Sequence, residues 1–256
     1  MSKLLRSTVG LFVVLGLVSM ASGGPLAGNV EELFETYSEG ALIGQPCPTT
    51  GNLWAANGAW ADVNIVGTSG VPVYGSGQGA DSAADLVWAQ VQFLDPPVDE
   101  GVVIFSFDIF NTVGIPGGGS SVAFIGLDPG NGQIWTLPWA AFRLDGEPGG
   151  FALQGLVEGF AMIDDTFPLQ ANNVGLHVEA TFDLDGKTLT VDYVGLGEGA
   201  PSGTWNTSYT ADLAFDTWGM HNNTPTTSWD NFRLVPEPAT LCLLGLGGLA
   251  LLRRRR

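Results

Sequence analysis

The sequence predicts an all-β fold, an antiparallel β-sandwich, on three observations. First, 37 Gly and 15 Pro among 256 residues interrupt long helices and favour short strands joined by turns. Second, apolar and polar residues alternate with period two over many short segments, as in strands with one buried face. Third, 45% hydrophobic and 14% charged residues suffice to fill one core. We therefore expect two packed antiparallel sheets over residues 29–235.

The first 23 residues are predicted to be a secretory signal peptide. Lys3 and Arg6 precede an uncharged apolar stretch from Val9 to Met20, and small residues follow it. As a helix this stretch reaches ~18 Å, which is short of a ~30 Å hydrocarbon core. We expect signal peptidase to cleave after Ala21 or Gly23, and an uncleaved membrane anchor is the alternative.

Period-two alternation predicts strands along the whole middle of the chain, with bends at Gly- and Pro-rich connections. About ten strands result from this pattern, and we expect no helix longer than two turns outside the termini. The segments, apart from the hairpin described next, are Trp60 to Val66, Leu86 to Leu94, Gly101 to Phe110, Val122 to Asp128, Gln133 to Phe142, Phe151 to Val157, Leu213 to Met220 and Ser228 to Val235.

The clearest pair of strands is a hairpin around Asp185 and Gly186. The alternation runs from Leu176 to Leu184 and resumes from Leu189 to Tyr193. A two-residue Asp-Gly loop suits a type I′ turn, because both positions need φ > 0. This loop sets the register so that partner numbers sum to 371. Every apolar side chain of the pair then falls on one face.

The polar face of this hairpin is a candidate binding surface. The register places Glu179 opposite Asp192, and a like-charge pair is costly unless it is solvated or bridged by a cation. We interpret the face either as a solvated outer surface or as a surface for a polar ligand, with Ca²⁺ as an optional bridging ion. A lone Asp-x-Asp-Gly lacks the other ligands of a calcium loop, so the turn better explains Asp183 and Asp185.

The last 21 residues combine a tripeptide, an apolar segment and a basic end. Ala239 to Leu252 carry no charge and span ~21 Å as a helix, which suffices for a membrane if the flanking arginines snorkel or the bilayer thins. Four cations held in the cytoplasm would stop transfer of the chain. We therefore predict a C-terminal transmembrane helix, with 239–252 as its apolar segment and 253–256 as its basic end, within a terminal segment of residues 236–256. The alternative, a buried core helix, must accommodate three glycines at ~1 kcal/mol each.

The same segment resembles a known sorting signal. The order Pro236-Glu237-Pro238, a Leu/Gly-rich stretch and a terminal arginine cluster is similar to the PEP-CTERM protein-sorting signal of bacterial exported proteins. In that family a membrane-embedded exosortase cuts near the motif and passes the protein to the envelope or the extracellular polymer. The resemblance implies that Pro236, Glu237 and Pro238 form the recognition element. It also implies a retention element made of Arg253, Arg254, Arg255 and Arg256.

A second resemblance concerns the predicted domain. The segments from Phe34 to Gln45 and from Ser228 to Leu234 look like the first and last strands of concanavalin A-like (LamG-like) lectin/glucanase jelly rolls. The resemblance implies that these two strands lie side by side. That family contains carbohydrate-binding modules, adhesion domains and polysaccharide hydrolases, so the fold leaves the function open.

The charge of the predicted domain limits its partners. Arg143, Lys187 and Arg233 stand against 25 acidic residues between positions 29 and 235, which gives a formal net charge of −22. Such a surface repels nucleic acid and anionic lipid and lacks a basic stripe for phosphate. We expect no nucleic-acid partner. Neutral glycans remain candidate ligands, whereas an anionic polysaccharide would need a bridging cation such as Ca²⁺.

We expect no enzymatic activity. Glucanases of this fold place carboxylates at alternate positions of one strand, with a separation near ~5.5 Å, and no such run occurs here. His177 and His221 leave a Ser/His/Asp or Cys/His site conceivable, but Cys47 lies between two prolines without a visible partner. Cys242 would leave with the C-terminal segment, so Cys47 would be the sole thiol of the mature chain.

Tryptophans are the other candidate ligand contacts, because the apolar face of a sugar ring packs on an indole. Most of the eight tryptophans are expected in the core. Trp54 and Trp205 lie in predicted loops or beside small polar residues, so we expect these two to be exposed. Together with Glu179 and Asp192 they are the predicted ligand-binding residues.

These observations predict an exported, exosortase-processed protein of the cell surface or extracellular matrix with a non-catalytic β-sandwich. It would be held transiently in the membrane by its C-terminal segment. A glycan-binding module, assisted by Ca²⁺ or not, is the first alternative, and a polysaccharide hydrolase is the second. No other cofactor is expected.

Overall fold

The computed structural model describes residues 30–56, 64–66, 78–81, 87–111, 120–127, 139–147, 150–157, 160–168, 174–196, 201–222 and 227–236. Asn29–Val235 form one compact unit. All named elements are strands, and they form two antiparallel sheets packed as a sandwich, which confirms the all-β prediction. The described residues contain no helix of the length and apolar character that a membrane crossing requires. The predicted signal peptide and most of the C-terminal segment lie outside the described residues.

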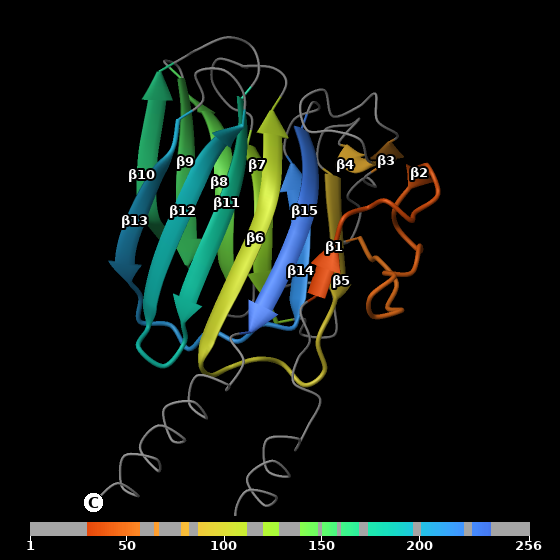
Figure 1. The fold of residues 1–256 in the computed structure, drawn as a ribbon, viewed down its shortest axis with the longest axis horizontal. Helices are drawn as coiled ribbons and strands as arrows, with labels where there is room; N and C mark the ends of the chain where they lie inside the picture. Colours follow the sequence, from red (N-terminus) through yellow and green to blue (C-terminus); the bar gives the residue numbers. More distant parts are fainter. Residues whose placement is uncertain are drawn as a thin grey trace, which may run out of the picture. The chain divides into compact units, whose positions relative to one another are not determined.

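The larger sheet has nine strands, in the order β13-β12-β11-β6-β15-β4-β3-β2, with β1 paired to β15. It is the front sheet of Figure 1, where β13 forms one lateral edge. Its strands are β1 Val30–Glu32, β2 Gly40–Ala41, β3 Asn64–Val66, β4 Gly79–Asp81, β6 Val102–Asn111, β11 Val174–Asp183, β12 Thr188–Leu196, β13 Gly203–Ser208 and β15 Thr227–Pro236.

The smaller sheet has six strands, in the order β10-β9-β8-β7-β14-β5, and lies behind the first in Figure 1. Its strands are β5 Val87–Gln92, β7 Ser120–Gly126, β8 Ala140–Glu147, β9 Gly150–Val157, β10 Phe160–Pro168 and β14 Thr217–Asn222.

The core lies between the sheets and is rich in aromatic rings. Phe105 on β6 contacts Trp218 on β14 with ring centroids 6.4 Å apart, and Phe107 contacts Phe142 on β8 at 5.9 Å. Phe232 of β15 joins the same group, 6.0 Å from Phe105. All five side chains are at most 1% exposed. Because one face of each strand supplies these rings, the alternate residues must point away from the core on the two outer faces.

The terminal strands of the unit lie side by side, as the jelly-roll resemblance implies. β1 pairs antiparallel with β15, and Val30 lies opposite Leu234. The expected first strand from Phe34 to Gln45 is wrong in position, because the strand precedes it and most of this segment forms turns. Phe34 has a positive φ of 57°, which ends the extended run while its side chain stays fully buried.

The hairpin has the predicted register but a different turn. Glu179 lies opposite Asp192 and Phe182 opposite Leu189, as the sum of 371 requires. The turn is wrong, because it spans four residues from Leu184 to Lys187, and the left-handed residue is Lys187 with φ 52°. The carboxylate of Asp183 accepts a hydrogen bond from the backbone N–H of Gly186 at 2.7 Å and so favours this longer loop over a type I′ turn.

Four strands were missed by the sequence prediction: β1, β4, β10 and β13. β10 and β13 each alternate less clearly, since β10 carries adjacent aspartates and β13 has few apolar residues. Of the other predicted strands, residues 57–63 and 133–138 lie outside the described residues, whereas the described parts correspond to β3, β5 to β9, β14 and β15.

Candidate functional site

The outer face of the nine-stranded sheet presents rows of polar side chains. Cross-strand partners point to the same side of a sheet, so the registers define each row. One row runs from Ser106 through Glu179 and Asp192 to Thr204, across β6, β11, β12 and β13. We use the term open face for this row and its neighbours, which comprise Ile104, Thr181, Thr190 and Asn206 on one side, and Asp108, His177 and Val194 on the other.

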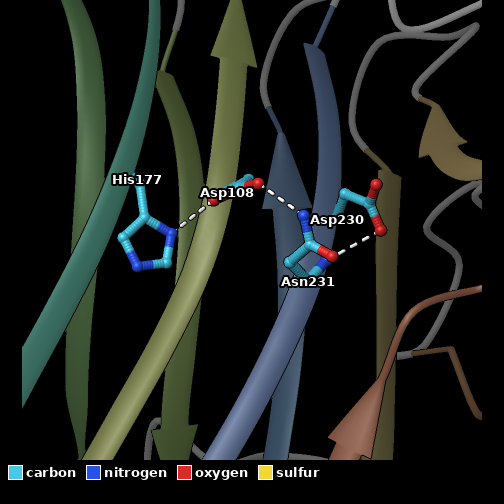
Figure 2. A network of polar contacts seen from close by, with 4 residues as sticks. All are labelled: Asp108, His177, Asp230 and Asn231. Carbon is cyan, nitrogen blue, oxygen red and sulfur yellow. Dashed lines mark hydrogen bonds and ion pairs between the residues drawn. The ribbon is translucent and has the colours of Figure 1, made fainter. Parts of the chain in front are cut away.

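A network of three side chains joins three strands at one end of the open face (Figure 2). A carboxylate oxygen of Asp108 on β6 lies 2.6 Å from Nδ1 of His177 on β11. The other carboxylate oxygen accepts a hydrogen bond from the side-chain amide of Asn231 on β15, also at 2.6 Å. Asp108 is largely buried, whereas the His177 side chain is 38% exposed. The network therefore holds an accessible imidazole in a fixed orientation.

Asn231 adopts an unusual backbone conformation that serves this network. Its φ of 53° lies in the left-handed region, which Asn tolerates better than most residues. Its backbone N–H donates to the carboxylate of Asp230 at 2.7 Å, and its side chain reaches Asp108 on the next strand. A residue in this region costs free energy, and the hydrogen bonds of Asn231 to Asp230 and Asp108 hold it there.

The Asp108 carboxylate sets the charge of the imidazole. Its hydrogen bond raises the pKa of His177 above the ordinary 6.5, against the lowering effect of burial, and the charges of Asp108 and Glu179 act in the same direction. With Nδ1 directed at Asp108, the Nε2 edge is left to face a ligand. Protonated His177 would donate a hydrogen bond there, and neutral His177 would accept one.

The predicted pair of Glu179 and Asp192 lies on this face, and both side chains are exposed. Asp192 accepts a hydrogen bond from the hydroxyl of Thr204. Ca²⁺ requires six to eight oxygen ligands. Within the described parts of the chain, no three His, Cys, Asp or Glu side chains converge on one point, so these residues do not fit a complete calcium site.

The two tryptophans that were predicted to contact a ligand differ in their exposure. The expected exposure of Trp54 is wrong, because it is 1% exposed and its indole N–H donates to the hydroxyl of Tyr37 at 2.8 Å. Buried in this way, it cannot stack on a sugar. Trp205 on β13 is half-buried and packs against Tyr193 with ring centroids 5.3 Å apart. It lies on the core side of its strand, so it is not part of the open face.

Of the predicted sorting residues, Pro236 is the last residue of β15. Glu237, Pro238 and the terminal arginines lie outside the described residues. Cys47, the predicted sole thiol, is fully buried in the loop after β2.

The outer face of the six-stranded sheet carries a mixed row of apolar and polar side chains, which the sequence pattern did not reveal. The registers align Trp88, His221, Val122, Arg143 and Gln154 across β5, β14, β7, β8 and β9. Trp88 is fully buried and His221 is 7% exposed, so this row is covered rather than open. Burial lowers the pKa of His221 to about 4 and so keeps the imidazole neutral at pH 7.

Asp108 and Asn231 were also missed, although the sequence held a signal for one of them. Within the strand from Gly101 to Phe110, Ser106 and Asp108 occupy the outward positions of an otherwise apolar run. A charged residue there needs a partner, and that partner is His177, which the β6–β11 register places opposite.

Residues 234–256 match the family model of the PEP-CTERM protein-sorting motif. The chain is therefore an exported protein that is held transiently in the membrane, processed by an exosortase and sorted to the cell surface. No curated protein matches the chain in sequence.

The fold is similar to that of several solved structures. Lectin II from Ulex europaeus has 9% identity and a TM-score of 0.48, over 81% of this chain and 97% of that one. Peanut lectin has 11% identity and a TM-score of 0.45 over the same shares. The catalytic domain of a GH131 β-glucanase from Podospora anserina has 12% identity and a TM-score of 0.41, over 68% of this chain and 78% of that one.

Proposed function

We propose that the sandwich is a non-catalytic module that binds neutral glycans at the cell surface through its open face. The observation that carries this proposal is the Asp108–His177–Asn231 network beside the exposed Glu179 and Asp192. These groups are oriented hydrogen-bonding partners on a rigid sheet, and binding such a site costs little ordering entropy.

The chemistry of the open face selects the ligand class. Carboxylates, hydroxyls and an amide accept and donate hydrogen bonds at the spacing of neighbouring strands, which suits a ligand rich in hydroxyl groups. Three of the groups named in its rows are carboxylates, Asp108, Glu179 and Asp192, and the domain has a net charge of −22, so an anionic chain would be repelled. A neutral sugar chain is repelled neither by these three carboxylates nor by the net charge of the domain.

Binding is tested on an array of neutral and acidic glycans, with and without Ca²⁺. The full chain is used in a polyoxyethylene detergent, because detergents with sugar headgroups would compete. We expect binding of neutral chains that does not require Ca²⁺. Glu179→Gln should weaken it at least tenfold, whereas Glu39→Gln, an identical change beside β2 at the far end of the sheet, should change it less than twofold. Equal effects of the two changes, or no binding to any neutral glycan, would refute the proposal.

The non-catalytic part of the proposal has its own test. Incubation of the full chain with the glycans it binds should release no new reducing ends over a day. Release that disappears in Glu179→Gln would show that the carboxylates of this face act as a hydrolase site, with Glu179 and Asp192 directly opposite each other on adjacent strands.

A further inference from the structure

His177 is the side chain of the open face that can change from a hydrogen-bond acceptor to a donor near neutral pH. Its Nδ1 lies 2.6 Å from a carboxylate oxygen of Asp108 (Figure 2). An ionised carboxylate only accepts hydrogen bonds, so Nδ1 carries a proton whether the ring is charged or not. The neutral ring therefore presents a bare Nε2, which accepts a hydrogen bond, and the charged ring presents an Nε2–H, which donates one.

Most of the other polar groups described on the open face accept hydrogen bonds from a ligand. The exposed carboxylates of Glu179 and Asp192 have no proton to donate when they are ionised. The hydroxyl group of Thr204 already donates to Asp192, and that of Thr190 donates to Asn206 at 2.7 Å. A sugar hydroxyl group both donates and accepts, so a face rich in acceptors leaves its accepting capacity unused. A donor at Nε2 of the imidazole would use that capacity.

The charged groups around the imidazole come from its own strand and from the strands beside it. They are Asp108 on β6, Glu179 on β11, Asp192 on β12, and Asp230 and Arg233 on β15. The acids in this set outnumber the cation, so the surroundings favour the charged ring. The hydrogen bond to Asp108 is the largest cause that raises the pKa of His177 above 6.5, and the charges of Asp108 and Glu179 add to it.

We propose that His177 regulates the open face, so that neutral glycans bind more tightly when its imidazole is protonated than when it is neutral. This inference rests on the proposed function and adds its regulation. In the complex, Nε2–H donates to a sugar oxygen, while the neighbouring carboxylate of Glu179 accepts from a sugar hydroxyl group. A hydrogen bond from a charged donor is roughly twice as strong as a neutral one, so loss of the proton weakens binding.

The test measures the binding of neutral oligosaccharides between pH 6 and pH 9 by isothermal titration calorimetry, with the full chain in a polyoxyethylene detergent. The probes are cellohexaose, laminarihexaose and maltohexaose, which carry no titratable group in this range. Because they are neutral, the net charge of the domain neither attracts nor repels them. Carboxyl groups ordinarily titrate below this range. We expect the dissociation constant of each probe that binds to be at least fivefold lower at pH 6 than at pH 9.

Two substitutions of histidine by glutamine separate His177 from every other titration. Glutamine keeps a hydrogen-bonding side chain but does not ionise, so the affinity of His177→Gln should change less than twofold over the range. His221→Gln makes the identical change on the other sheet, where burial lowers the pKa of the imidazole to about 4, and should keep the wild-type pH dependence. Asp108→Asn should move the transition to lower pH, because it removes the hydrogen bond and the charge that favour protonation.

NMR of the wild-type chain provides a measurement that does not depend on any variant. Because coupling is reciprocal, a ligand that prefers the charged ring must raise the pKa of His177 by the amount that the two affinities require. Three results would overturn the inference and leave glycan binding at the open face intact. They are binding that does not change with pH, a pH dependence that survives in His177→Gln, and a pKa of His177 that does not rise in the complex. Failure of all three probes to bind at any pH would overturn both proposals.

Discussion

The two histidines of the chain lie on opposite outer faces, and their surroundings shift their pKa values in opposite directions. His177 faces a carboxylate at 2.6 Å, which raises its pKa. His221 lies in the covered row, where burial lowers its pKa to about 4. Each histidine therefore makes stability depend on pH in a different range.

Asp108 should control the titration of His177. Asp108→Asn removes the hydrogen bond and the charge that raise the pKa, while burial, which lowers it, remains. We expect the pKa of His177, followed by NMR of its ring protons, to fall clearly in this variant. Glu179→Gln removes only the weaker charge contribution and should produce a smaller fall. Equal falls in the two variants would show that the hydrogen bond is not the main cause.

His221 should make the protein less stable as the pH falls. Its folded-state pKa is below the unfolded value of 6.5, so between pH 6.5 and about 4 the unfolded chain binds a proton that the folded chain refuses. In the wild type this costs about 3 kcal/mol of unfolding free energy as the pH falls through this range. We expect His221→Gln to remove that loss, as measured by chemical denaturation at each pH.

His177→Gln is the matched control for that experiment, and its sign is opposite. The pKa of His177 is raised, so its stabilisation is fully present below pH 6.5 and is lost as the pH rises through the folded-state value. A His221→Gln variant with the same acid dependence as the wild type would contradict the assigned burial effect.

At the level of strands, Gly219 on β14 marks a close approach within the six-stranded sheet. A Cβ at this position would collide with the ring of Phe124 on β7 and with the carbonyl of Ala89 on β5. We expect Gly219→Ala to destabilise the protein by about 1 to 3 kcal/mol in thermal or chemical unfolding, as overpacking does.

A second substitution tests the stated reason. Phe124→Leu in the Gly219→Ala background shortens the ring that the new methyl group meets. The double variant should be less destabilised than the sum of the two single changes. Simple additivity would indicate that the collision with Phe124 does not explain the loss.

Strands could be predicted where apolar and polar residues alternate strongly, but the turn between β11 and β12 could not. The β11–β12 register follows from the alternating apolar residues of both strands, which share one face, since a slip by one residue would turn the apolar residues of one strand to the outer face. The turn depends on the carboxylate of Asp183 reaching the N–H of Gly186, a local contact that an Asp-Gly pair does not reveal. The contact of His177 with Asp108 depends on which distant strand pairs with β11. A single sequence does not show which distant strands are neighbours.

At the scale of the molecule, the last strand is an interior part of the fold. β15 lies between β6 and β4 and supplies Trp229, Phe232 and Leu234 to the core, each at most 1% exposed. We expect a chain that ends after Pro236 to keep the fold, whereas a chain that ends before Thr227 should not fold. Circular dichroism and protease resistance would check both chains, and a folded product of the shorter one would contradict this role of β15.

The sorting motif begins inside this interior strand. The matched segment starts at Leu234, and β15 continues to Pro236, so the recognition tripeptide shares its first residue with the sheet. An enzyme with catalytic groups at the bottom of a narrow channel would have to separate the end of β15 from the sheet before it could bind the tripeptide. Cleavage would then be slower in a variant with a more stable sandwich than in a destabilised one.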